Sequence, residues 1–168
     1  MPLPKIRQPE IIEINSSLRL RAYDGNYMVA LPWYQDELVR RFSEGVTDEN
    51  KILYENYVKR KLDGPITNGE EYFIEVFENG KFVPIGDVTL KEDDPPIEIG
   101  VPRYRGIGIG TKVMKAFVLR AKEIGIKKIY NTGCYEDNIA SQKMLEAVGF
   151  ILVEHDLEER RKVYEICL

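Results

Sequence analysis

The stretch Tyr-Arg-Gly-Ile-Gly-Ile-Gly-Thr-Lys, residues 104–112, decides the fold class of this chain. It lies between a strand-like segment at 97–101 and apolar residues at helical spacing over 113–124. Glycine lets the backbone approach a ligand closely, and the free N–H groups at a helix N-terminus bind phosphate. Four basic residues in or beside the stretch add positive charge to an otherwise acidic chain. The stretch therefore predicts a site for a phosphate-bearing ligand.

Two common phosphate motifs do not match this stretch. Thr111 and Val113 stand where the dinucleotide fingerprint GxGxxG needs its last glycine. The P-loop needs a lysine directly after its last glycine, whereas Lys112 follows a threonine. Residues 105–110 do match the pattern [R/Q]-x-x-G-x-[G/A]. The structural alternative is a tight strand-to-helix turn without a ligand.

With this pattern the chain resembles the GNAT superfamily of acetyl-CoA-dependent N-acetyltransferases, which use the motif to cradle the coenzyme A pyrophosphate. Residues 101–104, Val-Pro-Arg-Tyr, are similar to the family's Pro-x-Tyr segment after the preceding strand. Residues 138–150, from Asn-Ile-Ala-Ser to Gly-Phe, are similar to the family's N-x-x-[A/S]…G-F segment. The resemblance is firm over 70–168. Residues 18–21 and 33–36 resemble the RimJ/RimL-like branch, which includes ribosomal-protein N-terminal acetyltransferases.

The resemblance implies an α/β (α+β mixed) chain with the single-domain GNAT acyl-CoA N-acyltransferase fold. The domain would cover residues 1–168, with a cofactor-binding core at about 70–150 and a mixed, mostly antiparallel sheet flanked by helices. The implied reaction is direct acetyl transfer from acetyl-CoA, the cosubstrate, to an amine in a ternary complex. The acceptor would be a small amine, a polyamine, an aminoglycoside or a protein N-terminus. Two alternatives are a GNAT-fold sensor that binds coenzyme A without turnover and another kind of nucleotide-binding protein.

By the same resemblance, a strand end, the glycine-rich loop and the start of the last helix bind the cofactor. The predicted cofactor-binding residues are Ile99, Gly100, Val101, Arg105, Gly106, Ile107, Gly108, Ile109, Gly110, Thr111 and Asn138. The backbone of 99–101 is expected to hold the pantetheine arm and to polarise the thioester carbonyl. Gly100 also fits a bulge. Asn138 has two open roles, as the helix N-cap or as a contact to the pantetheine arm.

The general base has two candidates, Glu98 and Asp87. An amine with a pKa near 10 must lose a proton before it attacks. Glu98 lies in the predicted cofactor strand between two isoleucines, and burial of this kind raises the pKa of a carboxyl group. Asp87 lies within a predicted strand, where aspartate is disfavoured. The alternative for each is an edge or outward-facing carboxylate.

Leu145 marks a departure from the family pattern. It stands seven residues after Asn138, where the family often has a tyrosine that acts as general acid. Transfer without this acid is feasible because a thiol with a pKa near 8.5 leaves as a thiolate. Cys134 is interpreted as a buried structural thiol, since nothing in its spacing supports a pair with His155, the single histidine.

The order of predicted elements favours a mixed sheet, because strands and helices alternate only in the second half of the chain. Residues 1–16 are interpreted as irregular, and Asn79-Gly80 as a hairpin turn. Thr47 is expected to cap a helix with Asp48 and Glu49 in its first turn, ending at Gly64-Pro65. The other predicted helices cover 35–42, 113–124 and about 138–148, the last with Ala140, Met144, Leu145 and Val148 on one face. The predicted strands cover 18–22, 72–77, 82–90, 97–101, 127–132, 151–155 and 161–167.

Composition narrows the classes of protein. The chain has 168 residues, enough for one core, and a net charge of −4, which argues against a broad nucleic-acid-binding surface. The longest apolar run, about 27–34, is far shorter than the ~20 residues of a membrane helix. Two cysteines and one histidine predict no metal site.

A cytoplasmic protein is expected, with acetyl-CoA and an amine as partners and a homodimer as a candidate assembly. Acidic clusters at 44–49, 70–71 and 92–94 either attract a cationic amine or form solvated surface.

Overall fold

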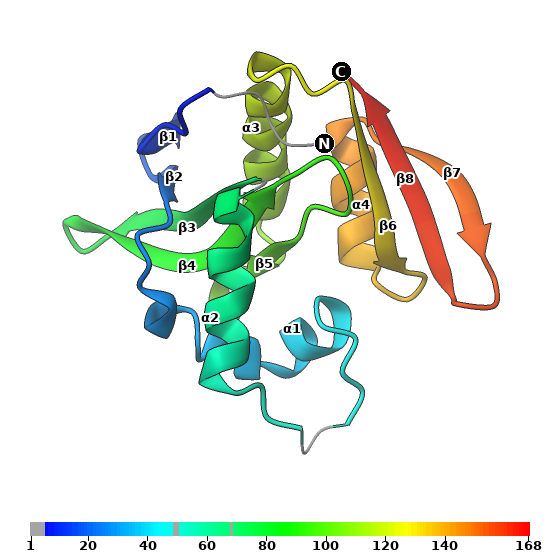
Figure 1. Cartoon of the computed structure of the whole chain (residues 1–168), viewed down its shortest axis with the longest axis horizontal. Helices are drawn as coiled ribbons and strands as arrows, with labels where there is room; N and C mark the ends of the chain where they lie inside the picture. Colours follow the sequence, from blue (N-terminus) through cyan, green and yellow to red (C-terminus); the bar gives the residue numbers. More distant parts are fainter. Residues whose placement is uncertain (1–5, 49–50, 68) are drawn as a thin grey trace.

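The computed structural model describes residues 6–48, 51–67 and 69–168 (Figure 1). Its strands and α-helices, in chain order, are β1 Ile11–Asn15, β2 Leu18–Ala22, α1 Glu37–Phe42, α2 Glu55–Asp63, β3 Glu70–Glu78, β4 Lys81–Leu90, β5 Ile97–Ile99, α3 Ile109–Glu123, β6 Lys128–Tyr135, α4 Ile139–Val148, β7 Ile151–Asp156 and β8 Arg161–Cys167. No helix within these ranges is long and apolar enough to cross a membrane.

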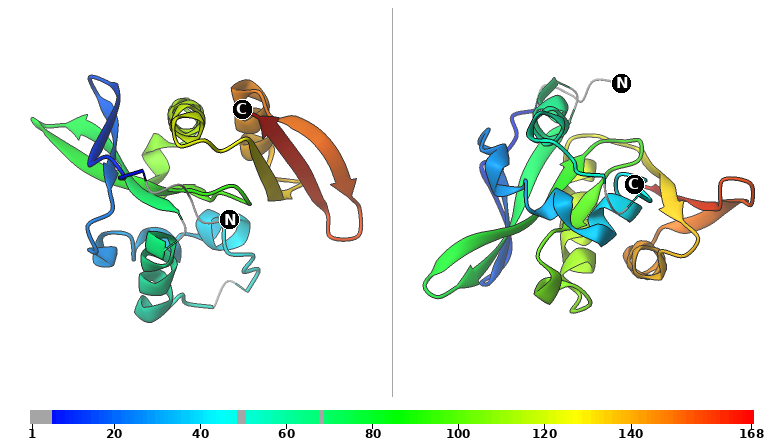
Figure 2. Two further views of the ribbon diagram at one scale, coloured as in Figure 1. Left: turned by 45° about the horizontal axis from the view of Figure 1, so that its top comes forward. Right: turned by 90° about the horizontal axis from the view of Figure 1, so that it is seen from below.

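The strands form two antiparallel sheets joined by a short parallel contact. One sheet has the order β1-β2-β3-β4-β5, and the other has the order β6-β8-β7. Asp93 and Tyr130 form a parallel bridge between the two sheets. Helices flank the strands (Figure 2). The expected fold, a mixed and mostly antiparallel sheet flanked by helices, is confirmed.

The two sheets separate directly after this bridge. Asp94 N donates to Tyr130 O at 2.8 Å, and Pro95 and Pro96 follow, which have no N–H to continue the pairing. The Asp94 carboxylate accepts from the backbone N–H groups of Thr132 and Gly133 at 3.2 and 2.9 Å. If the parallel pairing continued, these two N–H groups would be available to the neighbouring strand. Because Asp94 occupies them, β5 and β6 separate, and the gap between them is called the fork.

Each face of the larger sheet has its own core. On one face, Tyr72, Ile74 and Val76 of β3 belong to the apolar cluster that includes α3. On the other face, Phe73 packs with Trp33 and residues of α1 and α2. Figure 2 shows α3 on one side of this sheet and α1 and α2 on the other. The alternation along β3 therefore directs one set of side chains toward each helical layer.

Two predictions about the first half of the chain are wrong. Residues 11–15 form β1, an edge strand whose Ile-Ile-Glu-Ile-Asn sequence lacks strict alternation. The helix does not begin at Thr47: Asp48 is outside any helix, Glu49 lies outside the described residues, and α2 begins at Glu55. The side chain of Gln35 binds both backbone groups of Leu53, donating to its O at 2.5 Å and accepting from its N at 3.1 Å. This double contact keeps Leu53 out of a helix.

The remaining elements follow the predictions closely. Asn79 and Gly80 both have positive φ, 52° and 81°, as the tight turn between β3 and β4 requires. The helix near residue 138 is confirmed, but Ala140 is exposed and is not part of its buried face. Gln142 and Leu145 are its buried residues instead. The helical pattern did not predict the burial of Gln142, because glutamine is rarely buried without specific hydrogen bonds.

Candidate active site

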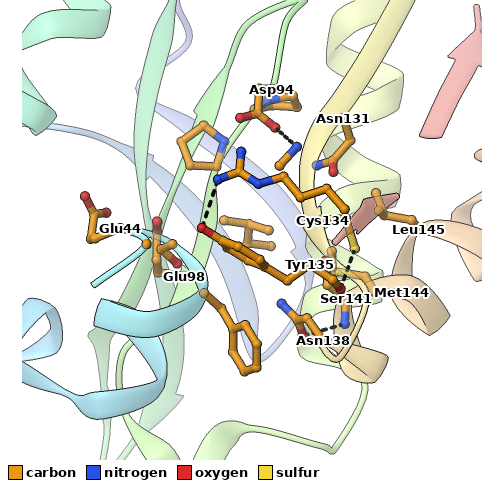
Figure 3. Close-up of a pocket in the computed structure, with 18 of the residues that line it drawn as sticks. Glu44, Asp94, Glu98, Asn131, Cys134, Tyr135, Asn138, Ser141, Met144 and Leu145 are labelled. Carbon is orange, nitrogen blue, oxygen red and sulfur yellow. Dashed lines mark hydrogen bonds between the residues drawn. The ribbon is translucent and has the colours of Figure 1, made fainter. Parts of the chain in front are cut away.

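The fork encloses a cavity of about 260 Å³ between β5 and β6. The segment after α1, β5, β6, α4 and the first residue of β8 contribute to its walls. Figure 3 shows Glu44 and Glu98 on one side of the cavity, with Asn131 and Leu145 on the other. The cavity is thus charged on one wall and mixed in polarity on the opposite wall.

The glycine-rich loop forms a cradle of backbone donors in front of α3. Gly106 and Gly108 have φ values of +73° and +88°, which side chains rarely adopt. A Cβ atom at either position would meet nothing within 4 Å, so the space beside the loop is open. Gly108 precedes α3 without a side-chain cap, and Lys112 N makes the first helical bond to Gly108 O at 3.2 Å. The preceding N–H groups are therefore available to an anion, and they fit a pyrophosphate.

Other members of the predicted cofactor segment have roles within the protein itself. A Cβ atom on Gly110 would lie 3.1 Å from Met144 Sδ, so this glycine allows α3 and α4 to pack closely. Ile107 is exposed in the loop, while Ile109 and Thr111 lie in the first turn of α3. The loop geometry agrees with the cradle, although cofactor contacts of these residues remain predictions.

Arg105 connects the glycine-rich loop to two other elements. Its Nε donates to Ile99 O at 2.7 Å, and its guanidinium pairs with Asp36 at 3.0 Å. Asp36 also caps α1 by accepting from the N–H groups of Leu38 and Val39. In this structure the side chain of Arg105 therefore holds the loop against β5 and α1, and its predicted contact with the cofactor remains a prediction.

The backbone at the end of β5 differs from the expectation for 99–101. The N–H groups of Gly100 and Val101 both donate to Ile85 O, at 2.8 and 3.1 Å, and are directed toward β4. Because directions alternate along an antiparallel strand, the N–H of Ile99 points to the opposite edge, on the side of the fork. Of the three predicted residues, Ile99 is thus the one whose N–H is placed to reach a ligand in the fork. The close approach at Gly100 comes from Trp33, whose Cγ would lie 2.1 Å from an added Cβ.

The candidate bases Asp87 and Glu98 lie side by side in a buried carboxylate row. They are direct cross-strand partners on β4 and β5, and their exposed fractions are 1% and 2%. Glu71 of β3 is also buried on this face. The alternative of outward-facing carboxylates is therefore wrong for both candidates. Glu98 lines the cavity, whereas Asp87 lies one strand behind it.

Specific partners hold this row in place. Tyr34 OH donates to Asp87 Oδ1 at 3.0 Å, and Lys61 Nζ donates to Glu98 Oε1 at 3.1 Å. Lys61 also forms an ion pair with Glu44. Glu98 Oε2 is buried and has no hydrogen-bond partner. Glu98 therefore has one oxygen fixed by Lys61, while its other oxygen is buried and lacks a fixed donor among the described residues.

Burial and mutual repulsion set the charge state of the row. Burial raises the pKa of Asp87 well above its usual range, and the negative charges of Glu98 and Glu71 raise it further. Burial also raises the pKa of Glu71. For Lys61, burial acts to lower the pKa, but the carboxylates of Glu98 and Glu44 outweigh it and raise the pKa above its usual value. The row therefore favours the protonated form of Asp87 and the charged form of Lys61.

Residues near the last helix agree with part of the expectation. Asn138 caps α4 by accepting from Ser141 N at 3.2 Å, which confirms its role as a cap, while its contact to the pantetheine arm remains a prediction. Leu145 is fully buried in the cavity wall. Cys134 is a buried thiol as predicted, and burial raises its pKa.

Burial of several acidic residues near the site was not predicted from the sequence. The acidic pair at 70–71 is buried and does not form solvated surface; Glu70 is paired with Arg120. The side chain of Glu44 is buried too. The one available signal was the position of Glu71 directly before the apolar run of β3. The contributions of Lys61 and Tyr34 had no local signal, because each depends on a contact with a distant strand.

Comparison with known proteins identifies the class. Residues 31–150 match the Acetyltransferase (GNAT) family, so the chain belongs to this family. The protein is therefore an acetyl-CoA-dependent N-acetyltransferase. No curated protein sequence matches the chain significantly.

Solved structures agree with this fold at low sequence identity. A domain from Methanocaldococcus jannaschii DSM 2661 has a TM-score of 0.74 and 22% identity, with 92% of this chain and 100% of that chain covered. An acetyl transferase from Salmonella typhimurium that modifies the N-terminal serine of ribosomal protein L7/L12 has a TM-score of 0.66 and 18% identity, with coverages of 95% and 99%. A spermidine N-acetyltransferase from Vibrio cholerae, in complex with CoA and spermine, has a TM-score of 0.66 and 16% identity, with coverages of 91% and 96%.

The raised pKa of Asp87 predicts a specific pH dependence of stability. A group whose pKa is raised on folding contributes its full stability below its unfolded pKa, about 3.9 for aspartate, and loses it as the pH rises through the folded pKa. Asp87→Asn removes this titration and keeps an oxygen that can accept from Tyr34. We expect the free energy of unfolding to decline less from pH 5 to pH 9 in the variant, by about 1.4 kcal/mol for each pH unit of this range that lies below the folded pKa.

Denaturant unfolding at intervals of one pH unit measures this dependence. Asp93→Asn is the matched control, because Asp93 is exposed and should leave the curve unchanged. Parallel curves for the wild type and Asp87→Asn would show that folding does not raise the pKa of Asp87.

Proposed function

We propose that this protein transfers the acetyl group of acetyl-CoA directly to an amine acceptor while both molecules occupy the fork between β5 and β6. The observation that carries the proposal is the arrangement of the fork: a backbone cradle precedes α3, and the buried Glu98 lines the cavity with one unpartnered oxygen. We also propose that residues 1–168 form one catalytic domain. The relatives from Salmonella typhimurium and Vibrio cholerae act on a protein N-terminus and on a polyamine, and both acceptors are amines.

In this proposal the chain holds the cofactor through backbone groups. The N–H groups of 106–111 bind the pyrophosphate, since the loop is open and the helix dipole favours negative charge there. The N–H of Ile99 and the side chain of Asn138 bind the pantetheine arm. Acetyl-CoA supplies an acetyl thioester when it is bound.

Glu98 takes the proton of the acceptor amine. An amine with a pKa near 10 is mostly protonated at neutral pH, so a proton acceptor near the cavity is needed. Glu98 Oε2 is unpartnered, and Lys61 fixes the other oxygen of the same carboxylate. Asp87 lies one strand behind Glu98 and is the second candidate base; it would accept a proton only in its deprotonated form.

Departure of the thiolate needs no side-chain acid in this proposal. Leu145 lies in the cavity wall where a tyrosine would donate a proton, and its side chain has no donor. A thiol pKa near 8.5 makes the thiolate a tolerable leaving group. The alternative raised by the sequence, a sensor that binds coenzyme A without turnover, differs from this enzyme in one measurable property. Release of coenzyme A with any amine acceptor distinguishes the enzyme from the sensor.

The cradle is tested by the effect of acetyl-CoA on thermal stability. Binding to the folded state should raise the melting temperature, and NAD and ATP should raise it far less. Gly108→Val should abolish this rise, because a branched side chain would obstruct the loop. Gly25→Val is the matched control, since Gly25 has nearly the same φ, +87°, and equally open surroundings. Each substitution introduces about 1–2 kcal/mol of backbone strain, so a normal rise in Gly108→Val would refute the cradle.

The base is tested by Glu98→Gln, which keeps the shape and removes the proton acceptor. The maximal rate should fall about 10²–10⁴-fold, the affinity for acetyl-CoA should hold, and the acidic limb of the pH–rate profile should vanish. Glu165→Gln on β8 serves as a control, because Glu165 pairs with Lys128 outside the cavity. A small loss of rate with a persistent acidic limb would exclude Glu98 and direct the same experiment to Asp87.

A further inference from the structure

Arg161 is a cation in the cavity wall with no anionic partner in the part of the chain that the structure describes. It begins β8 beside Tyr135 of β6 and lines the cavity. Its Nη2 donates to Tyr135 OH at 3.0 Å, and its guanidinium lies 4.7 Å from the centre of that ring. Its Nε is buried without a hydrogen-bond partner. Among the described residues, each ion pair is formed by a cation other than Arg161. The half-buried guanidinium of Arg161 therefore has no counter-ion there.

The carboxylates in the same cavity are already engaged. Glu44 and Glu98 share the ammonium group of Lys61. Asp94 accepts from two backbone N–H groups of β6 at 3.2 and 2.9 Å. A partly buried guanidinium is most favourable beside an anion, which it binds through charge-assisted hydrogen bonds. The charge of Arg161 is therefore available to a ligand.

A second unpartnered group lies in the same wall. Asn131 of β6 lines the cavity, and its Oδ1 is buried without a partner. Together with Glu98 Oε2 on the opposite wall, the cavity has two unpartnered acceptors and one unpartnered donor, Arg161 Nε. Buried polar atoms are nearly always hydrogen-bonded in folded proteins, so three exceptions around one cavity point to a ligand. The complementary ligand has N–H groups at one position and an anionic oxygen at another.

We infer that the acceptor carries a carboxylate as well as its amine, as a free amino acid does, and that Arg161 binds this carboxylate. The inference rests on the proposed function and specifies its acceptor. The pyrophosphate is a poorer counter-ion for Arg161, because the cavity walls do not include residues of the glycine cradle at 106–108. A polyamine is disfavoured, because it would bring further positive charge toward Arg161. A peptide carbonyl could accept a hydrogen bond but would leave the guanidinium charge unbalanced.

Matched acceptors test the inference. Each of the twenty L-amino acids is compared with its C-terminal amide and its decarboxylated amine, with spermidine and a C-terminally amidated peptide as further acceptors, and release of coenzyme A is measured at saturating acetyl-CoA. At least one amino acid should exceed its amide and its decarboxylated amine in kcat/KM by about 10-fold or more. Arg161→Met should reduce that value about 10- to 100-fold and leave the carboxylate-free acceptors unchanged. Arg161→Lys should retain part of the preference.

Two controls separate specificity from structure. Arg160→Met alters the exposed neighbouring arginine, which pairs with Glu136, and should keep the preference. Thermal unfolding reports whether Arg161→Met is folded, and Arg161→Gln repeats the test with a polar side chain. The KM for acetyl-CoA should stay constant in all folded variants. A raised KM for acetyl-CoA in the Arg161 variants would assign the residue to the cofactor and overturn the inference.

The remaining outcomes distinguish this inference from the proposed function. Preference for spermidine, amides or the peptide, unaffected by Arg161→Met, overturns the carboxylate while acetyl transfer stands. If acetyl-CoA raises the melting temperature but none of the tested acceptors is acetylated, the inference is overturned and the sensor is favoured. If acetyl-CoA neither raises the melting temperature nor is consumed, the proposed function itself fails, and the inference fails with it.

Discussion

The separation of β5 from β6 is the constraint on which the rest of the site depends. Asp94 ends the parallel contact by occupying two N–H groups of β6, and the two prolines that follow offer no donors to that strand. The chain can then bury its backbone polar groups while leaving a cavity between two strands. Gly86 keeps β5 close on the other side, since a Cβ atom there would lie 1.9 Å from Glu98 O. β5 is thus tightly held by β4 and open toward β6.

The fork also explains why the site contains buried charge. Glu98 occupies the last strand of the larger sheet, so its carboxylate lies beside the cavity and also beside Asp87. Three buried carboxylates with one nearby ammonium would repel one another if all were ionised, and this repulsion together with burial raises the pKa of Asp87. The fold thereby tolerates a polar row beneath α1 and α2 in the position where the proposed chemistry needs a proton acceptor.

The sequence predicted the parts of this arrangement that local patterns encode. The glycine-rich loop, the Asn79-Gly80 turn and the cap at Asn138 depend on a few neighbouring residues, and all three lie where expected. The sequence could not decide whether Glu98 and Asp87 are buried or face outward, because a shift of one residue in register reverses the faces of a strand. Lys61 and Arg161 were missed, since their placement depends on contacts with strands far away in the sequence. Likewise, the late start of α2 follows from the contact between Gln35 and Leu53.

In the proposed reaction, one fork receives both the cofactor and the acceptor. A crystal structure of the protein with acetyl-CoA tests this claim most directly. We expect the pantetheine arm between β5 and β6, the pyrophosphate on the N–H groups of 106–111, and the acetyl group directed into the cavity lined by Glu98. Acetyl-CoA bound outside the fork, or a complex in which β5 and β6 pair along their length, would contradict it.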